Sequence, residues 1–256
     1  TCELWRDVRK MMDKEYPDAA LISEWSEPLN AIPAGFHVDF LLFFTTAYHS
    51  LFRLESDLFE QPIPRNPHCF FNKAGKGDIC EFLKDYQKYY DGTRDKGYIS
   101  IVSGNHDYPR LSIDRDKDDL LVAFAFLLTM PGVPFIYYGD EIGMRQIRGL
   151  TSKEGGYYRT GGRTPMQWNG SSNAGFSTGK AEDLYLPVDE SADRPTVDAQ
   201  LGDPDSLLEQ VREMVAVRHK HPALQADADF KVLYAQQDQY PFIYQRTSAD
   251  ERFIIV

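Results

Sequence analysis

Apolar and polar positions alternate along the chain in a way that predicts helices and short strands in turn. In residues 4–12 the apolar side chains recur on one helical face, and this helix is expected to end before Pro17. Residues 19–25 then predict a strand that runs into Glu24. Residues 37–44 form an almost continuously apolar run, which is typical of a strand buried on both faces.

The same alternation continues through the middle of the chain. Residues 46–60 predict a helix, residues 61–76 predict a proline-containing loop, and residues 79–90 predict an amphipathic helix. Asp78 and Glu81 resemble a capping box at the start of that last helix.

A β-rich run over residues 98–102 follows, then a buried helix over residues 120–130 and a buried strand over residues 133–138. Polar residues come directly after this strand, in Gly139-Asp-Glu-Ile-Gly143. The repeated order of helix and strand predicts an α/β fold with a parallel sheet and right-handed crossovers.

The rest of the chain breaks this pattern. From about residue 145 to residue 200 no periodicity survives, so we expect a long loop that acts as a binding lid. A last helix is expected to start at Asp203-Pro204 and to end at His221. Three short aromatic and β-branched strands then follow, so we predict one domain over residues 1–226 and the beginning of a second over residues 227–256.

Composition places the chain among globular proteins and excludes several partners. Hydrophobic residues make up 42% of the chain and aromatic residues 13%, which is too apolar for a disordered protein. The formal net charge of -11 repels phosphate backbones, and no local basic patch offsets it, so we expect no nucleic-acid partner. Cys2, Cys69 and Cys80 are odd in number and far apart, so they suggest neither a disulfide framework nor a metal site.

An uncharged run over residues 120–139 matches a membrane span in length. Pro131, Gly132 and Pro134 divide it into a short helix and a short strand, both of which fit a soluble core, so we expect no membrane partner. The N-terminus opens inside the first helix without a start methionine or a signal pattern, so we expect the chain to begin within a longer protein. The cysteine usage fits a reducing compartment, and a cytoplasmic location is expected.

Three predicted strands end in ionisable side chains, namely Glu24, Asp107, and Asp140 with Glu141. Loops that leave the carboxyl ends of parallel strands surround one pocket, so residues far apart in sequence can meet there. Paired carboxylates around a pocket suit glycoside hydrolysis, in which one acid protonates the leaving oxygen and another stabilises an oxocarbenium-like transition state. Taken alone, Asn105-His-Asp107 would be interpreted as a plain turn, because these residue types favour turns.

Four motifs make the assignment more specific: Ile22-Ser-Glu24, Ser103-Gly-Asn-His-Asp107, Gly132-Val-Pro-Phe-Ile-Tyr-Tyr-Gly-Asp-Glu-Ile-Gly143 and Gly162-Arg-Thr-Pro-Met-Gln-Trp168. In this order they resemble the α-amylase superfamily, glycoside hydrolase family thirteen. The last motif, with Asn105-His-Asp-Tyr-Pro-Arg110, is similar to the oligo-1,6-glucosidase and α-glucosidase branch. The resemblance implies that the chain is the C-terminal half of a (β/α)8 TIM barrel, strands five to eight, followed by the start of a C-terminal antiparallel β-domain.

The resemblance also implies roles for the matching residues. Glu24 would be the general acid/base, and Asp107 would bind sugar hydroxyls and stabilise the transition state without attacking. His106 would hydrogen-bond sugar hydroxyls, and Arg163 would help to recognise the non-reducing-end glucose. Trp25 is expected to line the neighbouring subsite. No cofactor and no metal ion are expected.

Other interpretations of these residues stay open. Glu24 at a strand end is also compatible with an ordinary surface residue, His106 with a structural histidine and Trp25 with a core tryptophan. Arg110 either touches substrate or holds a carboxylate. Asp140-Glu141 is expected to order its loop rather than to react.

One departure from the family pattern concerns the nucleophile. Members with the retaining mechanism carry a nucleophilic aspartate at the end of the fourth strand, with an arginine two residues earlier, and no Gly-x-Arg-x-Asp motif occurs in this chain. We therefore expect the nucleophile to come from the N-terminal half of the barrel, outside residues 1–256, or the chain to pair with another copy. A half barrel alone would leave two sheet edges open.

The expected activity is retaining hydrolysis of α-glucosidic bonds in short oligosaccharides. One alternative is a glucosyl-transferring or sucrose-isomerising relative. A second is a non-catalytic accessory subunit of a transporter, although such relatives tend to lose catalytic carboxylates, whereas Glu24 and Asp107 are both present. Tyr108 stands where α-glucosidase relatives often have glutamine, which leaves the subfamily open. The α-1,4 or α-1,6 preference is also open, because the loops that shape the subsites belong to the N-terminal half of the barrel.

Overall fold

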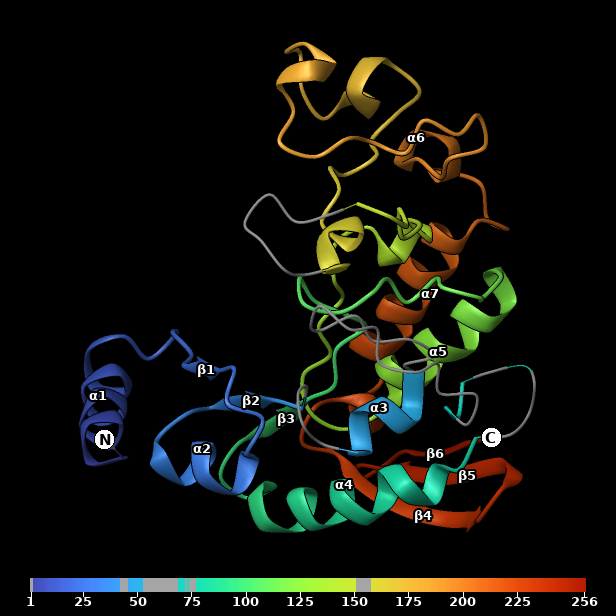
Figure 1. Ribbon diagram of the computed structural model, residues 1–256. Coiled ribbons are helices and arrows are strands. Elements are labelled where there is room, and N and C mark those ends of the chain that lie inside the picture. The colour runs from blue at the N-terminus through green and yellow to red at the C-terminus, as the bar shows by residue number, and fades with distance from the viewer. Residues whose placement is uncertain (1, 42–45, 53–68, 72, 74–76, 151–157) are drawn as a thin grey trace.

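The computed structural model describes residues 2–41, 46–52, 69–71, 73, 77–150 and 158–256 (Figure 1). The first half holds α1 (Cys2–Glu15), β1 (Ile22–Ser23), α2 (Pro28–Ala34), β2 (Val38–Phe40), α3 (Thr46–Phe52), α4 (Ile79–Thr93), β3 (Tyr98–Ser100) and α5 (Lys117–Thr129). The second half holds the 3-10 helices η1 (Asp140–Ile142), η2 (Tyr158–Gly162), η3 (Ser172–Gly175) and η4 (Ala181–Asp183), then α6 (Val197–Gln200), α7 (Leu207–Lys220), η5 (Pro222–Leu224), β4 (Asp229–Gln236), β5 (Gln239–Thr247) and β6 (Arg252–Ile255).

The first three strands form a parallel sheet in the order β1, β2, β3, which confirms the predicted α/β arrangement with helices between parallel strands. Ser23 lies opposite Asp39, and Asp39 lies opposite Ile99. Each strand is shorter than the apolar run that predicts it. Residues 42–45 of the second predicted strand lie outside the described residues.

The fourth predicted strand, over residues 133–138, is wrong as a full strand. It pairs in parallel with the end of the third strand run through a single bridge, Val102 to Phe135. Ser103 N donates to Phe135 O over 2.9 Å, so the direction and the neighbour are as expected. On both sides of Pro134 the bonds to this neighbour are long, since Val133 N donates to Ile99 O over 3.3 Å and Phe135 N donates to Ile101 O over 3.4 Å, so the pairing is weaker than in a regular ladder.

Helix starts follow local capping chemistry. Asp78 accepts a hydrogen bond from Cys80 N over 2.8 Å, which confirms it as the N-cap of α4. The predicted start of the last helix at Asp203-Pro204 is wrong, because Ser206 is the N-cap of α7 and accepts from Glu209 N over 3.2 Å. The Asp203 carboxylate instead accepts from Asp205 N over 3.0 Å and closes a turn before the helix.

The long segment after Gly143 contains only short elements in its described part, namely η2, η3, η4 and α6. In Figure 1 this segment, yellow to orange, rises above α5 and α7, at the opposite end of the view from β4, β5 and β6. Residues 151–157 of the predicted lid lie outside the described residues, as do residues 53–60 of the helix predicted over residues 46–60 and most of the loop after it.

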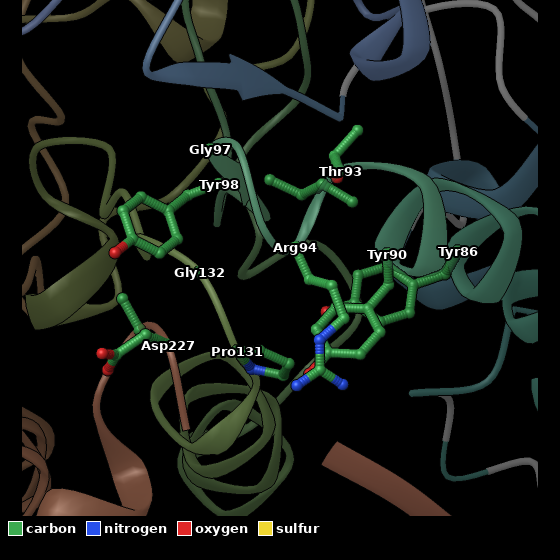
Figure 2. Close-up of a pocket in the computed structure, with 11 residues that line it drawn as sticks. Tyr86, Tyr90, Thr93, Arg94, Gly97, Tyr98, Pro131, Gly132 and Asp227 are labelled. Carbon is green, nitrogen blue, oxygen red and sulfur yellow. The ribbon is translucent and has the colours of Figure 1, made fainter. Parts of the chain in front are cut away.

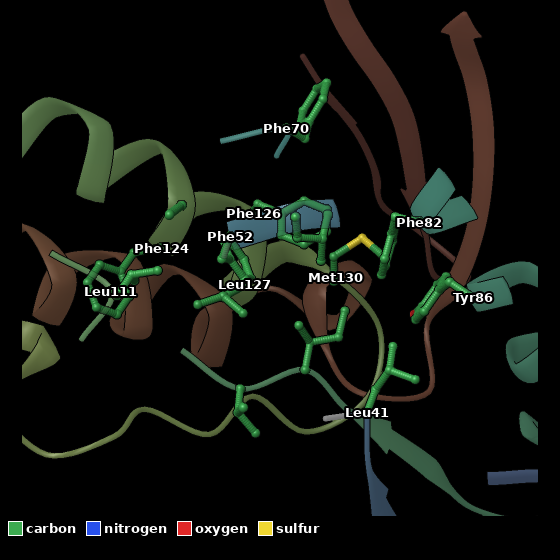
Figure 3. Packing of buried hydrophobic residues seen from close by; sticks show 14 of the residues in the cluster. Leu41, Phe52, Phe70, Phe82, Tyr86, Leu111, Phe124, Phe126, Leu127 and Met130 are labelled. Atoms are coloured by element: carbon green, nitrogen blue, oxygen red, sulfur yellow. The ribbon is translucent and has the colours of Figure 1, made fainter. Parts of the chain in front are cut away.

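The core lies between α4, α5, the parallel sheet and the antiparallel sheet (Figure 3). Phe82 of α4 and Phe126 of α5 are buried, with ring centroids 5.8 Å apart. Tyr86 and Tyr90 of α4 pack edge-on against Phe230 of β4, at 5.9 and 5.7 Å. Each fully buried large apolar side chain contributes about 1.5–3 kcal/mol, so this cluster supplies much of the cohesion of the fold.

Two buried arginines join the C-terminal sheet and α7 to the end of α5. Arg246 of β5 is fully buried and donates to Gln225 O, Ala228 O and the carbonyl of Thr129 at the end of α5. Arg218 of α7 donates to Leu128 O at 2.7 Å, and to the carbonyls of Met130 and Gly132. These bonds satisfy carbonyls that a helix end leaves without intrahelical partners.

The antiparallel sheet pairs β4 with β5 and β5 with β6, as the three predicted strands require. Figure 2 shows a small pocket near this junction, between Tyr86, Arg94, Pro131 and Asp227. Its volume of about 20 Å³ has room for about one water molecule, so it is too small for a sugar. In the described part of the chain, no helix is long and apolar enough to span a bilayer.

Candidate active site

Glu24 follows β1 directly and is exposed, and Trp25 beside it has 42% of its surface exposed. The turn that carries them is fastened by Asp39 of β2, whose carboxylate is fully buried. Its Oδ1 accepts from Trp25 N over 3.1 Å and its Oδ2 accepts from Glu27 N over 2.8 Å. The Ser23 hydroxyl donates to the same carboxylate over 2.5 Å. The backbone on both sides of Glu24 is therefore held by one side chain.

The loop after β3 carries His106 and Asp107. Asn105 organises it, because its side-chain Oδ1 accepts from Asp107 N over 2.9 Å and from Tyr108 N over 3.1 Å. Such an Asx turn is the local reason that an asparagine precedes the two site residues. Tyr108 is buried, and its hydroxyl oxygen lies 3.2 Å from His49 Nε2. This contact anchors the end of the loop.

These two loops bring three predicted site residues together. Glu24, His106 and Asp107 each offer a ligand atom, and these atoms all lie within 4.8 Å of one another. His106 Nε2 lies 3.4 Å from Asp107 Oδ2. Positions 24 and 107 are distant in sequence and meet because their strands are parallel and end at the same edge of the sheet.

Two arginines from the long segment converge on the Asp107 carboxylate. Arg163 Nη2 donates to Asp107 Oδ1 over 3.2 Å, and its Nε donates to His106 O over 2.6 Å. Arg159 Nη1 donates to the same Oδ1. Asp107 is thus a mostly buried carboxylate, with a side chain 15% exposed, held by two guanidiniums. Such charge-assisted pairs are stronger than neutral hydrogen bonds and fix the carboxylate geometry.

Gly161 and Gly162 let the arginine-bearing segment approach the Asp107 loop. A Cβ on Gly162 would lie 3.0 Å from Gln146 Oε1 and 3.1 Å from Tyr108 O, and a Cβ on Gly161 would overlap the carbonyl of Ile147. A larger residue would therefore push the segment away from the site. This close approach explains the pair of glycines directly before Arg163.

The local charges shift several pKa values at the site. Burial, followed by the positive charge of Arg163, lowers the pKa of His106, so neutral imidazole is favoured. Burial, followed by Arg163, also lowers the pKa of Arg159. Burial raises the pKa of Glu141, which favours its protonated form. A neutral His106 can both accept and donate a hydrogen bond, as recognition of sugar hydroxyls requires.

Arg110 lies away from the open site. Its side chain and that of Asp140 have no exposed surface, and Arg110 Nη1 lies 3.5 Å from Asp140 Oδ1. Its guanidinium also donates to Tyr138 O and lies over the rings of Tyr137 and Tyr138. Of the two expectations for Arg110, these contacts favour holding a carboxylate, because a fully buried guanidinium cannot touch a substrate.

Asp140 accepts a hydrogen bond from the Ser103 hydroxyl over 2.7 Å, so it joins the ends of two neighbouring strand runs. This agrees with a loop-ordering role.

Sequence reasoning missed Arg159 and Asp39. A charged residue inside the apolar run 37–44 was the available signal for Asp39, whereas the distance between Arg159 and Asp107 in sequence gave no signal for their pairing.

Three oxygen and nitrogen ligands this close together can also hold a divalent cation in principle. The two guanidiniums on Asp107 already place two positive charges there, however, and these repel a metal cation. Because sugar hydroxyls are neutral and can bind the same carboxylates and imidazole, the charge arrangement favours a polyhydroxylated neutral ligand over a metal ion.

A family model described as the catalytic domain of α-amylase matches residues 1–227. The chain therefore belongs to the α-amylase family, and it has the TIM-barrel family fold with an antiparallel sheet. Among curated relatives, the trehalose synthase/amylase TreS of Mycolicibacterium smegmatis is 31% identical over 243 residues, which cover 84% of this chain and 39% of that protein.

The oligo-1,6-glucosidase of Parageobacillus thermoglucosidasius is 29% identical over 214 residues, which cover 70% of this chain and 36% of that protein. The chain thus spans less than half the length of these relatives. The solved structure of the trehalulose synthase MutB from Pseudomonas mesoacidophila MX-45 superposes with a TM-score of 0.73 at 21% identity. That comparison covers 99% of this chain and 49% of MutB, and at this identity it shows the fold alone.

Proposed function

We propose that this chain is the C-terminal half, strands five to eight, of the catalytic barrel of a retaining α-glucosidase that acts on short oligosaccharides. The observation that carries this proposal is the meeting of Glu24, His106 and Asp107 within 4.8 Å, with Asp107 clamped by Arg163. Membership of the α-amylase family supports it, as does the match to an oligo-1,6-glucosidase.

In this mechanism Glu24 protonates the glycosidic oxygen in the first step and deprotonates water in the second. Asp107 accepts hydrogen bonds from sugar hydroxyls and stabilises the oxocarbenium-like transition state. The pairs with Arg159 and Arg163 hold the Asp107 carboxylate oriented for this role. Neutral His106 binds a neighbouring hydroxyl, and exposed Trp25 lines the adjoining subsite.

We propose that the attacking carboxylate comes from a segment outside residues 1–256, the N-terminal half of the barrel, or from a second copy of the chain. The three-stranded parallel sheet supports this, because β1 has no pairing partner on its outer side within the described residues. Closing the barrel would cover that edge. The three cysteines of the chain are odd in number and far apart in sequence, and this usage supports a cytoplasmic location for the enzyme.

The test uses the enzyme that contains this chain together with the proposed N-terminal half. Replacing the acid in Glu24→Gln should lower kcat/KM for maltose and isomaltose by about 10²–10⁴-fold, because protonation of the leaving group is lost. Glu27→Gln is a matched control on the same turn, with its carboxylate exposed beside Asn30. Unchanged turnover in Glu24→Gln would refute the assignment.

A second candidate is a glucosyl-transferring or isomerising enzyme with the same residues, which the match to trehalose synthases favours. Product analysis separates the two. Incubation with maltose and with sucrose should release glucose as the main product if the enzyme hydrolyses, and should release an isomeric disaccharide if it transfers the glucosyl group within the site.

A further inference from the structure

Asp39 is a charged residue in the middle of β2, and it has no exposed surface. Burial raises the pKa of its carboxyl, and the hydrogen bonds from Ser23 and from the backbone of the turn after β1 oppose that rise. Within the described ranges these hydrogen bonds, and not a counter-ion, compensate its charge. A buried carboxylate without a counter-ion is costly, so its place in an apolar strand draws attention to the groups that it binds.

The hydrogen bonds of Asp39 enclose Glu24 in the sequence. Ser23 Oγ donates from the residue before it, and Trp25 N and Glu27 N donate from residues after it. Trp25 N belongs to the peptide group that joins Glu24 to Trp25, and a peptide group is planar. Its bond to Asp39 Oδ1, over 3.1 Å, therefore orients this plane and with it the ψ angle of Glu24.

The turn after Glu24 also contains an unfavourable backbone conformation. Ser26 has a φ of 59°, in the left-handed region that residues other than glycine rarely adopt. Such a conformation persists only where the surrounding structure holds it. The neighbouring Glu27 N–H donates to Asp39 Oδ2 over 2.8 Å, so Asp39 supplies part of that restraint.

The Glu24 side chain depends on this backbone for its position. Glu24 is exposed, and within the described ranges no group donates a hydrogen bond to its carboxylate. The turn that carries Glu24 therefore brings its carboxylate into the cluster with His106 and Asp107, in which the ligand atoms lie within 4.8 Å of one another. A misplacement of about 1 Å can slow an enzyme reaction about 10²-fold, so a restraint on this turn bears on the rate.

We propose that Asp39 is a positioning residue for the general acid/base, and that it sets where the Glu24 carboxyl stands relative to the glycosidic oxygen. This inference rests on the proposed function, in which Glu24 protonates that oxygen. Asp39 is fully buried, so it does not touch substrate and acts through the Glu24–Trp25 peptide group. A merely structural role would make Asp39 important for folding without linking it to the protonation step.

The kinetic test uses the complete enzyme and compares a leaving group that needs protonation with one that needs little. Asp39→Asn keeps the shape of the side chain, but an amide has one acceptor oxygen and cannot accept from both N–H groups. Its kcat/KM should fall at least about tenfold more on maltose than on α-glucosyl fluoride, whose departure needs little protonation. The comparison uses kcat/KM because this ratio leaves out the second step, the attack of water.

Two further single variants complete the comparison. Asp78→Asn is the matched control, because Asp78 is also a buried carboxylate that accepts from a backbone N–H, at the start of α4, and its losses on the two substrates should be equal. Ser23→Ala removes a bond of 2.5 Å to Asp39 and a longer one, of 3.4 Å, to Val38 O, so it should show the bias of Asp39→Asn more weakly. Ser23→Ala keeps the test decisive if Asp39→Asn fails to fold.

A double variant shows whether Asp39 acts through Glu24. In Glu24→Gln the acid is already lost, so adding Asp39→Asn should lower kcat/KM for maltose by less than about threefold, whereas independent roles would add their full losses. Equal losses on both substrates in Asp39→Asn and Ser23→Ala, or full additivity in the double variant, would overturn the inference and leave the proposed function standing. If Glu24→Gln itself loses no more on maltose than on the fluoride, the assignment of the acid fails, and the positioning role fails with it.

Discussion

Replacing Arg110 by methionine should destabilise the chain strongly although Arg110 does not face the site. The change leaves the Asp140 carboxylate buried, with the Ser103 hydroxyl as its closest described partner at 2.7 Å. Breaking a buried ion pair by removing one partner costs about 3–5 kcal/mol. The Nε and Nη2 atoms of Arg110 already have no hydrogen-bond partner among the described residues, so we expect the lower end of that range.

A loss of about 3 kcal/mol is a large part of the about 5–15 kcal/mol that stabilises a typical domain. Urea unfolding of the wild type and Arg110→Met, followed by circular dichroism, measures it. The double variant Arg110→Met/Asp140→Asn should recover part of the loss, because no uncompensated charge then remains buried. If Arg110→Met costs less than about 1 kcal/mol, or if the double variant is the sum of the singles, the argument from buried charge fails.

Three further outcomes follow from the structure. Arg159→Met should lower kcat/KM about 10- to 100-fold by removing one charged hydrogen bond from Asp107, whereas Arg194→Met in the same segment should leave it unchanged, as steady-state kinetics would show. His37 Nδ1 accepts from Leu21 N, and burial lowers its pKa, so its stabilising contribution is present above about pH 6.5 and lost as the pH falls. The free energy of unfolding, measured in urea, should therefore fall more between pH 7.5 and pH 5 in the wild type than in His37→Gln. The same pH dependence in both proteins would contradict this. Ser206→Ala should cost about 1 kcal/mol in the same assay by removing the N-cap of α7.

The periodic parts of the sequence predicted the element order well. The amphipathic α4, its Asp78 cap and the parallel order of β1, β2 and β3 follow from local patterns that tertiary packing does not override. Exact ends were less predictable. A helix can start at several polar residues, and Ser206 rather than Asp203 became the cap of α7 because of a turn that the sequence pattern alone does not select.

At the site, strand ends placed Glu24 and Asp107 correctly in one cluster, because parallel strands bring such residues together. Arg159 could not be found in this way, since it reaches Asp107 from a segment without periodicity. Its placement depends on the tight packing of Gly162 against Tyr108 O and of Gly161 against Ile147 O. The buried Arg110 shows the same limit, because an arginine in a motif does not reveal from its sequence position whether it faces substrate or core.

The arginine bonds at the end of α5 have a consequence for how the chain unfolds. Arg246 of β5 and Arg218 of α7 both donate to backbone carbonyls in and after the last turn of α5. Opening the antiparallel sheet would strip Thr129 O of its arginine donor and expose the helix end. The sheet and α5 should therefore exchange their amide hydrogens as a single cooperative unit, and a cut before β4 should loosen the helix that forms the centre of the core.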